Sequence, residues 1–548
     1  MSTFFIGLGI LLTLAFGGWR AWRRLRFFLH IFQLETYKID RYVSWCQSPG
    51  MRPVSFGWSH VAGALALGGA GVAYAAGLPW GAAGGLLACW PLLFISSRRY
   101  RRDAEKKPLA FTDRMRRLST TAGMLMTLLV GAGVGLGYAW DVPGAIVGGV
   151  AGLFLADLGG PLWVALAALI MTPVENAIQE GYKRQARTRL AELDHLHVIG
   201  ITGSYGKTST KHIVAELLGQ SYNVLATPGS YNTPMGICIV VNDKLRPEHQ
   251  VLVLEMGMRY PGDIKELCDI ATPDASVVTS VGIAHLETMG SVEAIAEEKA
   301  SIIDHTARGG PVVLNADNAH VDAMADRADG PVWRVSAEGN PEADIVATDV
   351  RYSTNGLACT VRDEEGRTAV FETHLLGKHN VTNLLLAVAL GRSMGMRLRQ
   401  MAHAARRLQP VEHRLKLRTE NGITIIDDAF NSNPVGARNA VDLLGEIEGG
   451  QRYIVTPGMV EMGAQEDEAN YALGQHIATR NVDGVYLVGA AQTEALRQGL
   501  QDGGFPEDRI HTHDTLFDAQ DALTTRLKSG DIVLYENDLP DQYEPVGA

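Results

Sequence analysis

The sequence has 548 residues, enough for about three or four domains. Its formal net charge of -11 argues against general nucleic-acid binding, because contacts with phosphates need a basic surface. The five cysteines are odd in number and far apart, with no C-x-x-C pair, so neither a disulfide framework nor a structural zinc site is expected.

The first 172 residues alternate apolar stretches with basic segments. Each of five apolar stretches is close to the roughly 17–25 residues that a helix needs to cross a membrane, and we predict five transmembrane helices. The stretches cover residues 2–19, 58–77, 80–95, 118–140 and 142–156. A further apolar run at 161–171 is short and predicts an interfacial or re-entrant helix.

Charge defines the expected orientation of this region. Segment 98–117 has nine Lys or Arg residues, whereas the turns at 78–79 and 141–143 have none, so the turns face outward by the positive-inside rule. An odd number of crossings places everything after residue 172 in the cytoplasm. We therefore predict a multi-pass protein of the cell membrane in contact with membrane lipid.

The pattern of glycine, tyrosine and proline over 71–85 recurs 64 positions later. This weak repeat predicts two similar helical hairpins that pack through small residues. A pocket for a lipid-linked substrate and a duplicated anchor are both open interpretations.

After a linker at 173–194, we predict two α/β domains, one at 195–411 and one at 412–548. In both, apolar strands alternate with helical patterns, which is typical of a parallel sheet with right-handed crossovers. Residues 342–376 alternate in the manner of strands and predict an antiparallel hairpin appended to the first domain. A hinge at 409–414 would let the two domains enclose a cleft.

The stretch 198–210 has the clearest chemical signal. An apolar, β-branched run predicts a buried strand that leads through a glycine-containing turn into a helix. Backbone N–H groups in such a turn converge and the helix dipole adds positive charge, so the turn can hold nucleotide phosphates. Lys207 would reach the terminal phosphates and Thr208 would hold Mg²⁺. The predicted phosphate-binding residues are Gly203, Ser204, Gly206, Lys207, Thr208 and Ser209. The alternative is a plain strand-to-helix turn, because the pattern is shorter than the strict P-loop.

Three more residues are candidates for chemistry, each with a simpler alternative. Glu255 ends a predicted strand, where a carboxylate can hold Mg²⁺, or it is a solvated loop acid. His285 ends the next strand, and it is either a ligand or a hydrogen-bonded core histidine. Lys299 lies in a predicted helix, where an exposed position is the default.

Together with the loop, five segments occur in the order and spacing of the Mur ligases. They are Glu-Met-Gly-Met-Arg-Tyr-Pro-Gly-Asp-Ile (255–264), Ala-His-Leu-Glu-Thr-Met-Gly-Ser (284–291), Gly-Lys-His-Asn-Val-Thr-Asn (377–383), His-Arg-Leu (413–415) and Ile-Asp-Asp-Ala-Phe-Asn-Ser-Asn-Pro (426–434). The chain most resembles the MurF type, which adds D-alanyl-D-alanine to the peptidoglycan precursor, and the resemblance covers about 195–500. It implies a P-loop central domain and a Rossmann-like C-terminal domain behind the α-helical transmembrane region.

The resemblance implies an ATP-dependent carboxylate–amine ligase that forms an acyl phosphate. Mg²⁺ and Lys207 would gather and neutralise the anionic groups. Thr208 and Glu255 would hold one Mg²⁺, His285 would lie near a second, and Lys299 matches a lysine that family members often carbamylate. Lys207, His285 and Lys299 are thus the predicted catalytic residues. The predicted contacts of the nucleotide are His379 and Asn383 at the adenine, Arg414 at the phosphates, and Asp428 with Asn431 on the ribose side.

The departures from the family pattern concern the substrates. The membrane region replaces the small domain that usually binds the UDP-sugar, so the acceptor is either a small-molecule or a lipid-linked cell-envelope precursor. In the second domain the motifs at 457–463 and 534–537 lose an acid and a lysine, so the amine is an amino acid or a dipeptide of undetermined identity. A synthase resembling those of poly-γ-glutamate and a non-catalytic membrane scaffold are the alternatives, and the sequence does not predict an oligomeric state.

Overall fold

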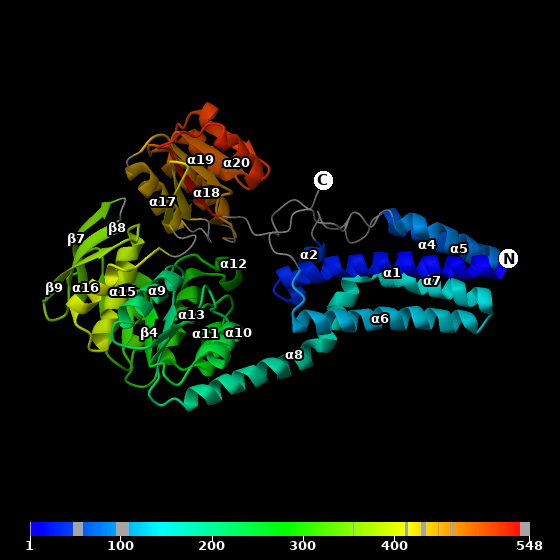
Figure 1. Ribbon diagram of the computed structural model, residues 1–548, viewed down its shortest axis with the longest axis horizontal. Helices are drawn as coiled ribbons and strands as arrows, with labels where there is room; N and C mark the ends of the chain where they lie inside the picture. Colours follow the sequence, from blue (N-terminus) through cyan, green and yellow to red (C-terminus); the bar gives the residue numbers. More distant parts are fainter. Residues whose placement is uncertain are drawn as a thin grey trace. The chain divides into compact units, whose positions relative to one another are not determined.

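The computed structural model describes residues 2–47, 58–94, 109–353, 356–410, 415–428, 434–447, 449–460, 462 and 465–537. These residues fall into two compact units, one ending at Gln179 and the other beginning at Glu180. The first unit is helical, and the second contains two β-sheets covered by helices (Figure 1).

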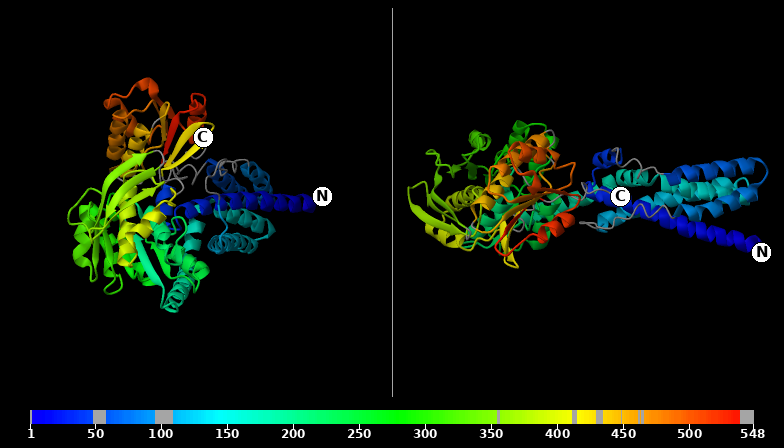
Figure 2. Two further views of the ribbon diagram at one scale, coloured as in Figure 1. Left: turned by 60° about the vertical axis from the view of Figure 1, so that its left-hand side comes forward. Right: turned by 90° about the horizontal axis from the view of Figure 1, so that it is seen from above.

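Most helices of the N-terminal unit run alongside one another (Figure 2), and α8 runs away from them. They are α1 (Ser2–Leu34), α2 (Ile39–Gln47), α4 (Trp58–Ala75), α5 (Pro79–Phe94), α6 (Asp113–Tyr138), α7 (Val142–Leu158) and α8 (Gly160–Ala191), whose last residues belong to the second unit. The predicted hairpins are present as α4–α5 and α6–α7. A Cβ on Gly133 would lie 2.2 Å from the carbonyl oxygen of Gly148, so α6 and α7 pack through small residues as predicted.

Buried ions join the N-terminal helices. Arg20 Nε of α1 donates to Asp157 Oδ2 of α7 at 2.9 Å, and His60 Nε2 of α4 lies 3.2 Å from the same oxygen. Arg117 of α6 donates to both carboxylate oxygens of Glu175 in α8, at 2.7 and 2.9 Å. Buried charges need well-placed partners, and these contacts connect α1 and α4 to α7 and connect α6 to α8.

Two of the described helices, α6 and α8, are long and apolar enough to cross a membrane, and α7 is apolar but shorter. These helices support the five predicted crossings only in part. The interpretation of 161–171 changes, because this run begins the continuous 32-residue helix α8, which also includes most of the predicted linker. The helix continues through Pro173, and the Glu, Gln, Lys, Arg and Ala residues beyond it favour helix although most are polar.

The first sheet of the second unit has nine strands in the order β2-β3-β1-β4-β5-β6-β7-β8-β9. They are β1 (His197–Thr202), β2 (Val224–Ala226), β3 (Val251–Glu255), β4 (Ala275–Val278), β5 (Val312–Asn315), β6 (Val332–Ser336), β7 (Ile345–Ser353), β8 (Gly356–Arg362) and β9 (Thr368–Thr373). The sheet is parallel as far as β7, and β7, β8 and β9 pair antiparallel. The predicted hairpin is therefore not an appendage, because β7 joins it to the parallel sheet.

Helices cover both faces of this sheet (Figure 1). On one face lie α9 (Lys207–Leu218), α15 (His379–Ser393) and α16 (Leu398–Ala405), and on the other α10 (Pro234–Ile239), α11 (Asp263–Ile270) and α13 (Val292–Asp304). Side chains of β3 alternate between the two cores: Val253 packs with the first group and Leu254 with the second. Burial on both faces explains why these strands are continuous apolar runs in the sequence.

The second sheet has the order β10-β11-β15-β12-β13-β14 and is parallel except for β10. Its strands are β10 (Lys416–Glu420), β11 (Ile423–Asp428), β12 (Arg452–Thr456), β13 (Gly484–Val488), β14 (Ile510–His513) and β15 (Ile532–Glu536). Its helices are α17 (Pro434–Glu446), α18 (Glu466–Ala478), α19 (Glu494–Asp502) and α20 (Leu516–Thr524). The prediction of two α/β domains is confirmed.

Candidate active site

The site lies at the topological switch point of the first sheet, where the connections between strands change direction along the sheet. Strand β1 is paired with β3 on one side and with β4 on the other, with Ile201 opposite Glu255 and Thr202 opposite Val278. The carboxyl ends of three strands therefore meet at one edge, which is where ligands bind in open α/β sheets.

Two glycines shape the turn between β1 and α9. Gly203 has φ +151°, and a Cβ there would lie 1.9 Å from Thr279 Oγ1. Gly206 has φ +83°, and its Cβ would lie 2.6 Å from Asn383 Oδ1. Both positions need glycine because side chains are strained in these conformations and neighbouring atoms occupy the space.

The turn is held by the segment that follows β4. Ser204 N donates to Ser280 O at 2.7 Å, and Tyr205 N donates to Ser280 Oγ at 3.0 Å. Gly282 N donates to Ser204 Oγ at 2.9 Å. These bonds fix the turn before any ligand binds.

The start of α9 is suited to an anion. Its N-cap is Gly206, which offers no side-chain cap, and its first turn has no acidic residue. The first N–H groups of a helix have no partner within the helix and lie at its positive end. The half-buried Lys207 donates from Nζ to Gly203 O at 2.7 Å, so its charge lies over the same turn. This geometry suits a phosphate group, and the phosphate-binding role of the turn stays a prediction.

Glu255 lies beside this turn and is 1 % exposed. Its Oε2 accepts from Thr208 Oγ1 at 2.9 Å and lies 3.1 Å from Lys211 Nζ, and its Oε1 accepts from Asn232 Nδ2 at 3.0 Å. Burial alone would raise the pKa of Glu255, but Lys211, Lys207 and the Thr208 hydrogen bond outweigh it and the pKa is lowered. The group is therefore a carboxylate at neutral pH.

The pair of Thr208 and Glu255 fits Mg²⁺. This ion takes oxygen ligands and is commonly held by one or two carboxylates together with phosphate oxygens and water. Within the described part of the chain, no group of three or more His, Cys, Asp or Glu residues is placed to hold a metal ion. The remaining ligands would accordingly come from the nucleotide and water.

The positive charge of Lys207 lowers the pKa of both His285 and Lys299. His285 caps α12 (Leu286–Met289) with φ +67°, and burial, Lys207, Lys299 and Arg259 lower its pKa to about 4. Lys299 of α13 is 1 % exposed, and burial and Lys207 hold its pKa well below the usual range. Their roles at a second metal ion stay predictions.

The predicted adenine residues lie on α15. His379 begins the helix, with Nδ1 3.5 Å from Asn439 Nδ2. Asn383 is buried, its Oδ1 accepts from Thr210 Oγ1 at 3.1 Å, and its Nδ2 donates to Asn380 Oδ1 at 3.0 Å. Asn383 therefore braces the start of α9, and its contact with adenine stays a prediction.

On the ribose side, Asp428 ends β11 and its Oδ1 accepts from Leu415 N at 3.2 Å. Arg414 and Asn431 lie outside the described residues. The predicted roles of these three residues are therefore untested.

Sequence analysis missed three residues that support the loop and Glu255, namely Lys211, Asn232 and Ser280. Lys211 had a detectable signal. It follows Lys207 by four residues, so both lie on one side of α9, and the residues after it on the buried side of the helix are apolar. The other two act from loops, whose approach to the site no sequence period reveals.

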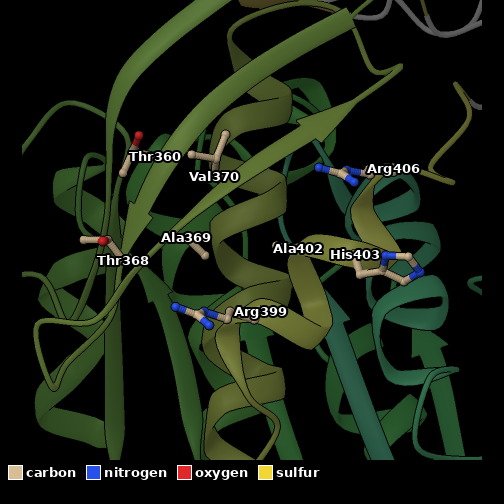
Figure 3. A pocket seen from close by; sticks show the side chains of 8 residues that line it. All are labelled: Thr360, Thr368, Ala369, Val370, Arg399, Ala402, His403 and Arg406. Atoms are coloured by element: carbon tan, nitrogen blue, oxygen red, sulfur yellow. The ribbon is translucent and has the colours of Figure 1, made fainter.

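A separate groove of about 470 Å³ lies between β8–β9 and α16 (Figure 3). It is lined by Thr360, Thr368, Ala369, Val370, Arg399, Ala402, His403 and Arg406. None of these residues belongs to the phosphate loop or contacts Glu255 in the described hydrogen bonds. The groove is therefore distinct from the candidate active site.

The class of nucleotide-dependent α/β enzymes is defined by three features of this site. They are a sheet with helices on both faces, the glycine turn at its switch point and the Thr208–Glu255 pair. Residues 201–391 match the Mur ligase middle domain, and residues 413–535 match the Mur ligase glutamate ligase domain. The chain belongs to the Mur ligase family and is an ATP-dependent, ADP-forming ligase.

Relatives and solved structures agree with this assignment. The UDP-N-acetylmuramoyl-tripeptide–D-alanyl-D-alanine ligase of Bacillus subtilis is 32% identical over 354 residues, which are 64% of this chain and 75% of the relative. The ligase of the same name from Escherichia coli is 30% identical over 371 residues, covering 66% of this chain and 78% of the relative. The structure of the MurF ligase from Thermotoga maritima in complex with ADP matches with a TM-score of 0.59 and 27% identity, covering 67% of this chain and 82% of that chain.

Proposed function

We propose that the chain is a membrane-anchored, MurF-like ligase that joins an amino acid or dipeptide to a carboxyl group of a peptidoglycan precursor. The observation that carries the proposal is the hydrogen bond from Thr208 to Glu255 beside the open start of α9. It places a carboxylate for a metal ion next to a phosphate-binding turn, as phosphoryl transfer requires.

The reaction has two steps. A carboxylate oxygen of the acceptor attacks the γ-phosphorus of ATP, the bond to the β-phosphate oxygen breaks, and ADP and an acyl phosphate form. The amine nitrogen then attacks the acyl carbon, the C–N bond forms, phosphate leaves and the amine loses a proton. Lys207 and the amides at the start of α9 stabilise the charge that develops on the phosphates.

Mg²⁺ would supply Lewis-acid stabilisation of the transferred phosphoryl group, and Thr208 and Glu255 would hold it. We also propose that Lys299 is carbamylated. The lowered pKa of Lys299 favours the neutral amine, which can attack CO₂ and release a proton. The resulting anion would suit a second metal ion near His285.

The membrane part of the proposal is supported by the surface of the N-terminal unit. Most of the exposed large apolar side chains among the described residues lie before residue 175, including Leu65, Leu128 and Leu136, each about 70% exposed. Apolar patches of this extent are typical of surfaces that face a membrane or a partner. The ends of the hairpins bring Tyr74 and Trp140 together at 6.4 Å between ring centroids, and such aromatic residues favour the membrane interface.

The test measures ADP release by the full chain in detergent with ATP, Mg²⁺, a UDP-linked or lipid-linked muramoyl tripeptide, and D-Ala-D-Ala or single amino acids. We expect turnover only when acceptor and amine are both present, and its loss in Lys207→Ala. Lys265→Ala is the matched control, because Lys265 is exposed and pairs only with Asp269 among the described residues.

The outcomes separate the alternatives. Polymerisation of glutamate without a muramoyl acceptor would favour a synthase like those of poly-γ-glutamate. Nucleotide binding without turnover in every substrate combination would favour a scaffold. Full activity of Lys207→Ala would contradict the assignment of the phosphate loop.

A further inference from the structure

The site contains a buried cation, Lys211, that is not part of the predicted phosphate loop. Lys211 lies one turn after Lys207 in α9, and its side chain is fully buried. Its ammonium lies 3.1 Å from Glu255 Oε2 and donates to the carbonyl oxygen of Gly229. A buried ammonium is costly unless its charge and its N–H groups are well paired, and Lys211 has both kinds of partner.

Gly229 belongs to the segment between β2 and α10, which contacts both Glu255 and Lys211 of α9. In this segment Asn232 donates to Glu255 Oε1, and Thr227 Oγ1 accepts from Glu255 N at 3.3 Å. Lys211 is therefore bonded both to the carboxylate and to the backbone of the segment that surrounds it.

The outer side of this segment is open. Gly229, Ser230 and Tyr231 are exposed, although the same stretch is tied to Glu255 from within. Under the proposed function an acceptor carboxylate reaches a metal ion at Glu255, and this exposed backbone is a surface next to that carboxylate. The bond from Lys211 to Gly229 thus connects a surface available to the acceptor with the side chain predicted to hold Mg²⁺.

We propose that Lys211 is a positioning residue that holds segment 228–233 against Glu255 and so aligns the acceptor carboxylate with the metal and phosphate site. The proposal rests on the proposed ligase function. It assigns Lys211 a role different from that of Lys207, which faces the phosphate loop. Loss of Lys211 should consequently weaken use of the acceptor more than binding of the nucleotide.

The first experiment needs no turnover. Two amides report on this segment: Tyr231 N donates to Pro228 O, and Gly257 N donates to Asn232 O. Hydrogen exchange of the full-length Lys211→Met protein should show faster exchange in peptides that contain these two amides, whereas Lys207→Met should leave them protected. Binding of a fluorescent ADP analogue should change by less than about threefold in Lys211→Met and fall by at least about tenfold in Lys207→Met, because only Lys207 lies over the turn predicted to hold the phosphates and would lose a charge-assisted contact with them.

The second experiment uses turnover with UDP-linked muramoyl tripeptide. We expect KM for this acceptor to rise at least about tenfold in Lys211→Met, with KM for ATP changed much less. If wild type does not use any muramoyl acceptor, the proposed function fails, while the exchange experiment still decides the role of Lys211.

The single variant Lys211→Met is expected to lower the Tm, because Glu255 loses its cationic partner. The double variant Lys211→Met/Glu255→Gln removes both charges, and it should recover the Tm while segment 228–233 still exchanges fast. Unchanged protection of this segment, or a loss of nucleotide binding equal to that of Lys207→Met, would overturn the proposal.

Discussion

The Thr208 hydroxyl donates a 2.9 Å hydrogen bond to Glu255 Oε2 across the boundary between α9 and β3. The two residues are far apart in the chain, and both are nearly inaccessible to solvent, at 4 % and 1 %. The contact means that the hydroxyl and the carboxylate are already oriented toward one point before a metal ion arrives.

Thr208→Val should therefore lower the apparent affinity for Mg²⁺, because valine keeps the shape and removes the hydroxyl. The expected loss is about 10–100-fold, measured by titrating Mg²⁺ in the ADP-release assay and by calorimetry with ADP. Thr208→Ser should restore most of the affinity. Equal Mg²⁺ dependence of Thr208→Val and wild type would remove Thr208 from the metal site.

Gly203→Ala should damage the phosphate loop. The new Cβ would lie 1.9 Å from Thr279 Oγ1 at a residue with φ +151°, so we expect a destabilisation of roughly 1–3 kcal/mol and weaker binding of an ADP analogue. Urea unfolding and fluorescence titration measure the two effects. Gly181→Ala is the control, because no atom lies within 4 Å of its Cβ. It should leave binding unchanged and should not lower stability, since alanine favours a helix over glycine by about 1 kcal/mol. Equal behaviour of the two variants would contradict the close packing of the loop.

His285 should make the metal-free protein less stable in mild acid. Its pKa is about 4 in the folded chain against an ordinary 6.5, with burial as the first cause. Between these values the unfolded chain binds a proton that the folded chain does not, so stability rises with pH through this window and falls as pH drops from 6.5 to 4. The contribution is on the order of 3 kcal/mol. Urea unfolding at several pH values should show a shallower dependence in His285→Gln than in wild type, and parallel curves would refute the assignment.

Lys299 should carry a carbamate in the presence of bicarbonate. Burial holds its pKa well below the usual range, which increases the share of the neutral amine, the form that reacts with CO₂. ¹³C NMR of the protein in ¹³C-bicarbonate should show a carbamate signal that is absent in Lys299→Arg and retained in Lys265→Arg. A spectrum without this signal, or one that keeps it in Lys299→Arg, would exclude the modification.

The sequence predicted most of the second unit because its strands have a clear physical signature. The strands buried on both faces, such as β3 and β13, are uninterrupted apolar runs, which sequence inspection detects. The short strand β2 was missed, since its three half-buried residues have no distinctive pattern. The glycine turn was predicted because its geometry depends on residue types within one short stretch.

The rest of the site depends on contacts between segments that are distant in the sequence. Neither composition nor the periodicity of apolar residues predicts such contacts. Ser280 and Asn232 reach the loop and Glu255 from irregular segments. Likewise, α8 was divided at residue 172 because hydropathy changes there and Pro173 follows, yet the helix continues through Pro173 to Ala191.

The end of α8 gives the boundary of a soluble fragment. Arg189 donates to Asn242 O and Leu245 O, both at 2.7 Å, and Lys183 lies 2.6 Å from Glu266. These contacts belong to the second unit, so a fragment that starts at residue 173 should be soluble, folded and able to bind an ADP analogue. A fragment that starts at residue 195 loses them, and with about 1.5–3 kcal/mol for each hydrogen bond to a charged group it should be less stable by several kcal/mol. Arg189→Met in the longer fragment should reproduce much of that loss in urea unfolding, since it keeps the apolar stem and removes the donors. Equal stability of the two fragments would show that the part of α8 after Gln179 does not stabilise the second unit.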